Sequence, residues 1–302
     1  MIWMSNIRIN SDSIWEGPTF MDPLEKIIAQ ADLPTLPTIY TRLDETINSP
    51  RASIADIGGI VGSDPALTAR LLRIANSAFY NFPSEIETVS RALTLVGTKQ
   101  LRDLVLATLV MDAFDGIASD VSNVDQFWRH SIGVGISARV LATYLREPNV
   151  EYFFVMGLLH DVGRLVINVC SPDISRQALK RSKESDGLLY KIEQELFGFD
   201  HAGVGQKLLE NWGLPASLSQ PVGAHHEPSS ANAYPQEAAI VHVADIFVSG
   251  LMLGSSGQYA VPPMDRVAWD LLGLGYDVFS TLFSQIEEQY GDAIKVFMSE
   301  AA

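Results

Sequence analysis

Cysteine and basic residues are both scarce in this sequence. Cys170 is the single cysteine among 302 residues, which excludes an intramolecular disulfide and a Cys-rich zinc site. Lys and Arg number 21 against 36 Asp and Glu, so the net charge is −15. That charge disfavours direct contact with a nucleic-acid backbone or an anionic membrane surface. We therefore expect a cytoplasmic protein that binds neither.

Long apolar runs and alternating β-branched runs are also rare. The first residues, MIWMSNIRINSDSIWEG, lack the apolar stretch of about 7 to 15 residues that a signal peptide needs. Later apolar runs are broken by charge or glycine well short of about 18 residues, so no membrane span is expected. With 47% apolar and 19% charged residues, the chain has the composition of a globular protein of one large or two modest domains.

Helix start signals recur along the chain and predict an all-α fold. In each, a capping side chain precedes a proline or a carboxylate in the first turn. These signals are Asp22 before Pro23, Ser53 with Asp56, Asp64 before Pro65, and Ser122 with Asp125. Hydrophobic periodicity then predicts helices near 22–31, 34–48, 53–61, 65–76, 88–95, 98–114, 123–146, 150–160, 173–183, 186–197, 201–211, 216–226, 236–253, 265–272 and 278–299.

A small, polar stretch, DGIASDVS at 115–122, separates two long helical patterns and predicts a lobe boundary. We expect an N-terminal arm over 1–21, a first helical lobe over 22–115 and a second helical lobe over 122–300. All six histidines follow the boundary. Any chemistry is therefore expected in the second lobe, and the first is expected to receive a partner or a signal.

Histidines and aspartates of the second lobe recur at intervals of about one helix plus a connection, so a helical bundle can bring them together. Imidazoles and carboxylates suit Fe, Mn, Zn or Ni. Five His and two Asp suffice for two metals that share a bridging carboxylate. Such a pair lowers the pKa of a shared water and holds the oxygens of a phosphoryl group during its displacement. The seven candidate ligands are His130, His160, Asp161, His201, His225, His226 and Asp245.

The motif order H … HD … H … HH … D resembles the HD superfamily of metal-dependent phosphohydrolases. It is most similar to the HDOD branch, the HD-related output domains of bacterial signalling proteins. LPTLPTIYTRL at 33–43, SDPALTARLLRIANSAFYN at 63–81 and VSRALTLVGTKQLRDLVLA at 89–107 resemble the amino-terminal HDOD motifs. The resemblance runs from about residue 22 to about residue 255. It implies an HD-type helical bundle with an additional amino-terminal helical lobe, and a role in bacterial signal transduction.

The resemblance also implies which residues share a metal. The first His, the HD pair and the last Asp would hold one ion, the later histidines a second, and Asp161 would bridge the two. The cofactors implied are two divalent or mixed-valence transition metals, with Fe or Mn favoured and Zn or Ni possible. The first set is His130, His160, Asp161 and Asp245, and the second is His201, His225 and His226.

Asp161 and Arg164 are the predicted catalytic residues. HDVGR places Arg164 where HD-GYP phosphodiesterases often have a phosphate-facing lysine, so its guanidinium would steady the substrate. Two departures from the family pattern narrow the expected substrate and the expected number of metals. EPSSANAYPQ replaces the GYP segment after the HH pair, which disfavours hydrolysis of cyclic di-GMP. Gln126 stands where some trinuclear relatives place Glu, so two metals are expected rather than three.

Two functions stay open on the sequence alone. One is a metal-dependent phosphohydrolase or phosphodiesterase, and the other is a non-catalytic signalling scaffold whose metal is structural or absent. The expected partners are signalling proteins or a phosphoester or nucleotide ligand, with a homo-oligomer possible. His242 either donates to a ligand of the site or is a core or partly exposed histidine. Glu227 either orients an imidazole or is a surface carboxylate.

Other patterns fail on context. GVGISA at 133–138 fits a dinucleotide-binding fingerprint, but it follows no strand, so close helix packing explains its glycines better. A metalloprotease HExxH would need a histidine where Ser230 stands. The residue three before each histidine is never acidic, which excludes the Glu-x-x-His motif of ferritin-like di-iron bundles.

Overall fold

The computed structural model describes residues 24–25, 34–77, 80, 82–114 and 121–298. Every regular element in these ranges is a helix, which confirms the predicted all-α fold. The longer elements are α2 (Thr38–Ile47), α3 (Ile54–Gly62), α4 (Pro65–Ala75), α5 (Val89–Val96), α6 (Thr98–Ala113), α7 (Val124–Tyr144), α8 (Val150–Leu159), α9 (Val162–Cys170), α10 (Pro172–Ser185), α11 (Leu189–Phe197), α12 (His201–Asn211), α13 (Ala216–Ala224), α14 (Pro235–Leu251), α15 (Arg266–Leu272) and α16 (Phe279–Phe297). Two short 3₁₀ turns are η1 (Pro228–Ser230) and η2 (Tyr276–Val278).

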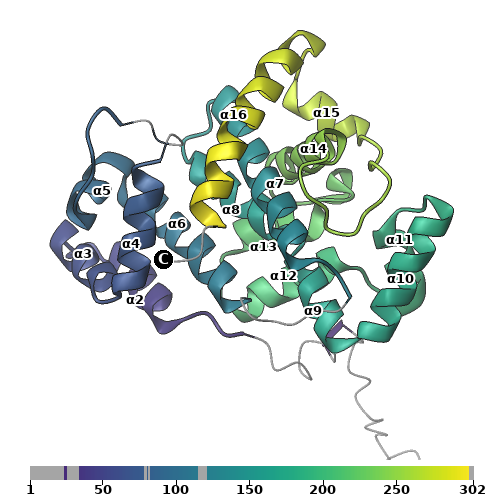
Figure 1. Ribbon diagram of the computed structural model, residues 1–302, viewed down its shortest axis with the longest axis horizontal. Coiled ribbons are helices and arrows are strands. Elements are labelled where there is room, and N and C mark those ends of the chain that lie inside the picture. The colour runs from purple at the N-terminus through teal and green to yellow at the C-terminus, as the bar shows by residue number, and fades with distance from the viewer. Residues whose placement is uncertain (1–23, 26–33, 78–79, 81, 115–120, 299–302) are drawn as a thin grey trace, which may run out of the picture.

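The amino-terminal helices α2 to α5 gather on one side of the molecule, and α10 and α11 lie on the opposite side (Figure 1). Helices α7, α8 and α12 to α14 occupy the middle, and α16 packs against α7 and reaches α4. Buried apolar side chains form a continuous core that runs from Tyr40 in α2 to Phe297 in α16. The predicted lobe boundary at 115–122 lies mostly outside the residues described.

Helix α8 connects the first-lobe helices to the site described below. At its start, the buried Glu151 accepts a hydrogen bond from the Tyr80 hydroxyl at 2.9 Å. Just before the helix, the Asn149 amide donates to the buried Asp103 of α6 at 2.8 Å. At its other end, His160 is the C-cap residue. Helix α8 therefore carries a buried, hydrogen-bonded carboxylate at one end and a candidate ligand at the other.

Two of the predicted helix starts are confirmed and one is shifted. Ser53 and Asp56 form a reciprocal capping box, and Asp64 caps α4 ahead of Pro65. The cap of α7 is Asn123 rather than Ser122, because the Asn123 side chain accepts the backbone N–H of Gln126. The helix predicted over 22–31 falls mostly outside the described residues.

Glycines allow α7 and α8 to cross closely. A Cβ at Gly157 would lie 2.6 Å from the carbonyl oxygen of Val134, and one at Gly135 would lie 2.8 Å from Phe154. The GVGISA stretch lies wholly inside α7, so its glycines serve helix packing as predicted. This crossing holds α8, and therefore His160, against α7.

Helix α9 lies between the helices predicted near 150–160 and 173–183 and was not expected. Helix α8 ends at Leu159 and α9 begins at Val162, so the link between them consists of His160 and Asp161. Gly163 lies in the first turn of α9, where it packs on α12. By length and composition alone the stretch Val150–Cys170 could cross a membrane, but 89% of its most apolar window is buried inside the fold.

Candidate metal centre

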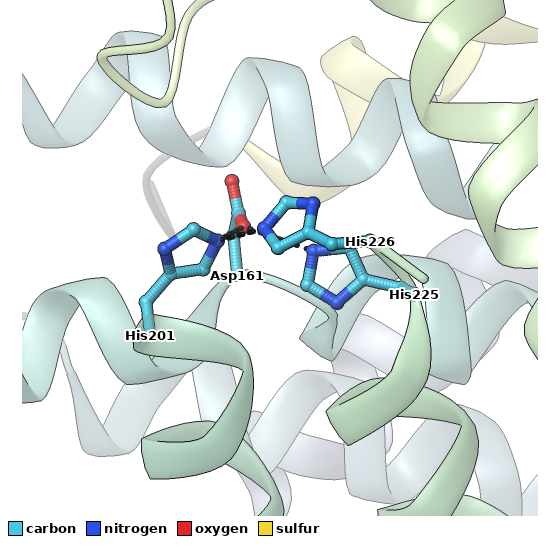
Figure 2. A group of neighbouring side chains, drawn as sticks. All are labelled: Asp161, His201, His225 and His226. Carbon is cyan, nitrogen blue, oxygen red and sulfur yellow. Dashed lines mark hydrogen bonds and ion pairs between the residues drawn. The ribbon is translucent and has the colours of Figure 1, made fainter. Parts of the chain in front are cut away.

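The seven candidate ligands come together in two groups, all buried except the partly buried His226, and within each group the ligand atoms lie within 4.8 Å of one another. The first group joins residues of α7, the end of α8 and α14. The second joins the α8–α9 link, the first residue of α12 and the two residues that follow α13 (Figure 2). Five separate chain segments therefore meet here. The groups are His130, His160 and Asp245, and Asp161, His201, His225 and His226.

Asp161 reaches both groups. Its Oδ1 lies 2.9 Å from Nε2 of His201 and 3.7 Å from Nε2 of His225, both in the second group. Its Oδ2 lies 3.3 Å from Nε2 of His160 in the first group. Figure 2 shows the imidazoles of the second group arranged around this carboxylate. One oxygen faces each group, which is the arrangement of a bridging carboxylate.

The remaining contacts close each group. In the first, Asp245 Oδ1 lies 3.1 Å from Nε2 of His130 and 3.9 Å from Nε2 of His160. In the second, the Nε2 atoms of His201 and His226 face each other at 2.7 Å. The Nε2 atoms of the imidazoles are thus directed at one another and at carboxylates.

Outward hydrogen bonds to backbone carbonyls set the orientation of two of the imidazoles. Nδ1 of His160 lies 2.7 Å from the carbonyl oxygen of Gly157, and Nδ1 of His225 lies 2.6 Å from that of Val222. Because a carbonyl only accepts, each Nδ1 carries the proton and each Nε2 keeps its lone pair toward the centre. This is the tautomer that a metal-binding histidine needs.

Four buried ligand atoms of the described chain have no hydrogen-bond partner: Nε2 of His130, His160 and His225, and Oδ1 of Asp161. The carboxylate contacts of these atoms are close without having hydrogen-bond geometry. An unpaired buried polar atom costs about 1–3 kcal/mol, so four of them in one place require an explanation. A cation within each group would satisfy them, and the nitrogen and oxygen donor set fits a divalent transition metal.

The charge states of the histidines differ. Burial lowers the pKa of His225 to about 3 and lowers that of His226 well below its usual value, so both are neutral. Burial and Arg164 also lower the pKa of His201, but Glu193 and Asp161 outweigh them and raise it to about 9. Without a metal, His201 is therefore protonated and lies between the carboxylates of Glu193 and Asp161. Its positive charge neutralises them in place of a metal ion.

Both aspartates are ionised at neutral pH. Burial favours the neutral acid, yet the neighbouring Arg164, His160 and His201 lower the pKa of Asp161 well below its usual value. For Asp245, burial is likewise outweighed by His130, which lowers the pKa of that carboxyl. Each group of ligand atoms thus contacts a buried, ionised carboxylate, which favours a cation there.

Arg164 lies beside the cluster and is 5% exposed. One terminal nitrogen donates to the carbonyl oxygen of Ser256 at 2.6 Å, and the other lies 3.4 Å from Nε2 of His201. Its Nε is 3.3 Å from Oδ2 of Asp161 but has no hydrogen-bond partner in the described part of the chain. The guanidinium therefore balances Asp161 and ties α9 to the loop that follows α14.

Sequence reasoning misses two residues that position histidines of the second group. The buried Glu193 of α11 accepts the backbone N–H of His201 at 2.9 Å, and the same oxygen lies 2.5 Å from its Nδ1. The ring of Tyr190 stacks on His226 with 4.2 Å between centroids. Both come from a different helix, and no motif spacing connects them to the histidines they contact.

His242 is buried next to the site, whereas Glu227 lies at the surface. The buried His242 donates from Nδ1 to the carbonyl oxygen of His225 at 2.8 Å and accepts the backbone N–H of Asp265 at Nε2. Both of its nitrogens are used, so it is a core histidine that supports the backbone of a candidate ligand. Glu227 is an exposed carboxylate.

The Glu193→Gln variant is expected to weaken metal binding by about 10- to 100-fold, the usual cost of losing a carboxylate behind a metal-bound histidine. The amide keeps the size of the side chain but removes the charge that holds Nδ1–H of His201. Titration of the metal-free protein with Mn²⁺ measures the effect. Glu195→Gln is the matched control, because Glu195 lies on the same helix with its side chain 61% exposed. Equal affinities for both variants would contradict the role of Glu193.

Comparisons with known proteins agree with this geometry. The family model of the HDOD domain matches residues 33–228. An HDOD domain protein of unknown function from Geobacter sulfurreducens has a similar crystal structure, with a TM-score of 0.79, 25% identity and coverage of 92% of this chain and 98% of that one. A candidate phosphohydrolase from Shewanella amazonensis SB2B superposes with a TM-score of 0.64, 25% identity and 91% coverage of each chain.

A curated relative extends the comparison without adding a function. An uncharacterized protein of Treponema pallidum (strain Nichols) is 23% identical over 227 residues, which are 75% of this chain. The match spans 42% of that relative's length.

Proposed function

Because the chain belongs to the HDOD domain family, we propose that it is a cytoplasmic signalling protein whose second lobe is a two-metal phosphohydrolase. The observation that carries the proposal is Asp161, whose two oxygens face two separate groups of ligand atoms. A structural metal site needs one closed set of ligands. Two sets joined by a carboxylate instead match the two-metal sites that hydrolyse phosphoesters.

Two divalent transition metals, when bound here, would supply Lewis acidity that activates a water and neutralises charge on a phosphoryl group. His130, His160 and Asp245 would hold the first ion, and His201, His225 and His226 the second, with Asp161 shared. The sulfur-free donor set suits Fe or Mn, and also accommodates Zn or Ni.

The protein's own residues prepare the site for an anionic substrate. Arg164 adds a positive charge beside Asp161, and its unpaired Nε–H can donate to a phosphoryl oxygen. Glu193 and Tyr190 fix the rings of His201 and His226, so that their nitrogens need no reorientation. Burial of the cluster excludes bulk water and strengthens each of these charge contacts.

One observation favours the second candidate, a metal-stabilised scaffold that acts through protein contacts. His160, His201 and His225 are all 0% exposed, so much of the cluster is enclosed as in a structural site. The partners on this alternative are signalling proteins, and the first lobe is the part we propose for contact with them.

Metal analysis followed by activity assays separates the two candidates. We expect two metal ions per chain in the purified protein, and release of product from a panel of phosphomonoesters and cyclic nucleotides. The His160→Ala, Asp161→Ala double variant should lose both properties. Metal without turnover of any phosphoester would favour the scaffold, and the absence of both metal and turnover from the wild-type protein would remove the enzyme.

A further inference from the structure

A cavity of about 200 Å³ opens beside the first group of ligands. His130 forms part of its wall, and so does Ser249, whose hydroxyl lies 3.4 Å from Oδ1 of Asp245. The rest of the wall comes from the loop between α14 and α15. The cavity is therefore placed to receive the part of a substrate that extends from the metal centre on its His130 and Asp245 side.

The loop that forms the wall is held in a fixed shape. Gly254, with φ of +78°, packs so closely that a Cβ would lie 2.3 Å from the backbone nitrogen of His130. The Ser255 N–H donates to the carbonyl oxygen of Gln126 at 3.0 Å. The Gln258 amide bridges the backbone of Leu189 and Ala260. A loop anchored to this extent presents a preformed pocket rather than one that must be assembled on binding.

The lining of the cavity mixes polar and apolar residues, and none of the described residues in it is acidic, lysine or arginine. The Ser256 and Tyr259 hydroxyls offer hydrogen bonds to a neutral ligand. Large apolar side chains stand at the mouth, where Met252 is 84% exposed, Tyr259 56% and Val261 52%. Lys183 lies outside the wall, with its ammonium 5.6 Å from the centre of the Tyr259 ring.

We propose that this cavity binds the sugar of a nucleoside monophosphate, with the base against the apolar mouth and the phosphate at the metal centre. The inference rests on the proposed function and names its substrate class. Hydroxyl groups of the wall suit a sugar, and exposed aromatic and apolar side chains suit the flat face of a base. A second phosphate in the cavity would be desolvated with no lysine or arginine among the described wall residues to pair with it, in a chain of net charge −15.

The first part of the test measures binding without turnover. Adenosine is titrated into the full-length protein and binding is followed by calorimetry. We expect Tyr259→Ala to weaken binding by at least about fivefold, since stacking of a base on an aromatic ring is usually worth that much or more. Tyr276→Ala is the control, because Tyr276 is 79% exposed and lies outside the cavity. Absence of adenosine binding, or equal binding by all three proteins, would overturn the proposal.

The second part compares hydrolysis of AMP with that of adenosine 3′,5′-bisphosphate, which adds a phosphate to the sugar. We expect at least a tenfold preference for AMP, and we expect Val261→Lys to reduce that preference while Val267→Lys, at an exposed position of α15, leaves it unchanged. A wild-type preference for the bisphosphate that depends on Lys183 would overturn the proposal. If neither compound is hydrolysed but adenosine binding still requires Tyr259, the pocket is supported and the proposed catalysis fails.

Discussion

The Asp161→Asn variant is expected to bind at most one metal ion per chain where the wild-type protein binds two, and to lose phosphoester hydrolysis. Asparagine keeps the shape of the side chain but removes the charge that both ligand groups share. Its amide nitrogen would also direct N–H donors at Nε2 of either His160 or His201, where lone pairs are needed. Loss of a residue behind a ligand costs about 10- to 100-fold in metal affinity, so loss of the bridge itself should cost more than about 100-fold.

Elemental analysis and Mn²⁺ titration measure this effect, and circular dichroism reports whether the variant is folded. Glu227→Gln is the matched control, because it makes the same change of carboxylate to amide on an exposed residue next to His226. Retention of two metals by Asp161→Asn would show that each group holds its ion without a shared carboxylate. Asp161 would then not be the bridging ligand on which the proposed two-metal mechanism depends.

Local signals predicted much of the fold because they act over a few residues. The Ser53 and Asp56 capping box, and Asp64 ahead of Pro65, are complete within one turn of sequence, and the structure has both. Helix α9 was not predicted as a separate helix because only two residues separate it from α8, and neither of them is a proline. Gly163 in α9 has to be glycine because of the backbone of α12, a helix that is distant in sequence, and no local signal reports such a contact.

The candidate ligands were found for a different reason. The sequence has only six histidines, and their order with two of the aspartates resembled a known family, so the set could be named before its geometry was known. Glu193 and Tyr190 carry no such signal, since glutamate and tyrosine are ordinary residues of an amphipathic helix. The wall of the cavity was equally hidden, because serine, glutamine and glycine in a loop indicate only a loop. These positions acquire meaning from contacts made across the fold.

The site depends on backbone packing as much as on its ligands, and Gly163 is where this dependence is greatest. Its α9 backbone lies directly against α12, so that a Cβ would be 2.1 Å from the carbonyl oxygen of His201 and 2.5 Å from the backbone nitrogen of Gly205. Neither atom belongs to a flexible side chain. A methyl group at this position can be accommodated only if the two helices move apart.

We therefore expect Gly163→Ala to lower the free energy of unfolding by about 3 kcal/mol, at the upper end of the usual cost of overpacking. The separation of α9 from α12 should also widen the 2.9 Å contact between Asp161 and His201, so that metal binding weakens along with stability. Urea denaturation of the metal-free protein and Mn²⁺ titration measure the two effects. The same substitution at Gly59, an exposed position of α3 with no atom within 4 Å of the added Cβ, should instead stabilise the protein by about 0.5–1 kcal/mol. If Gly163→Ala were as stable as Gly59→Ala, the close crossing of α9 and α12 would not be what holds the bridging carboxylate in place.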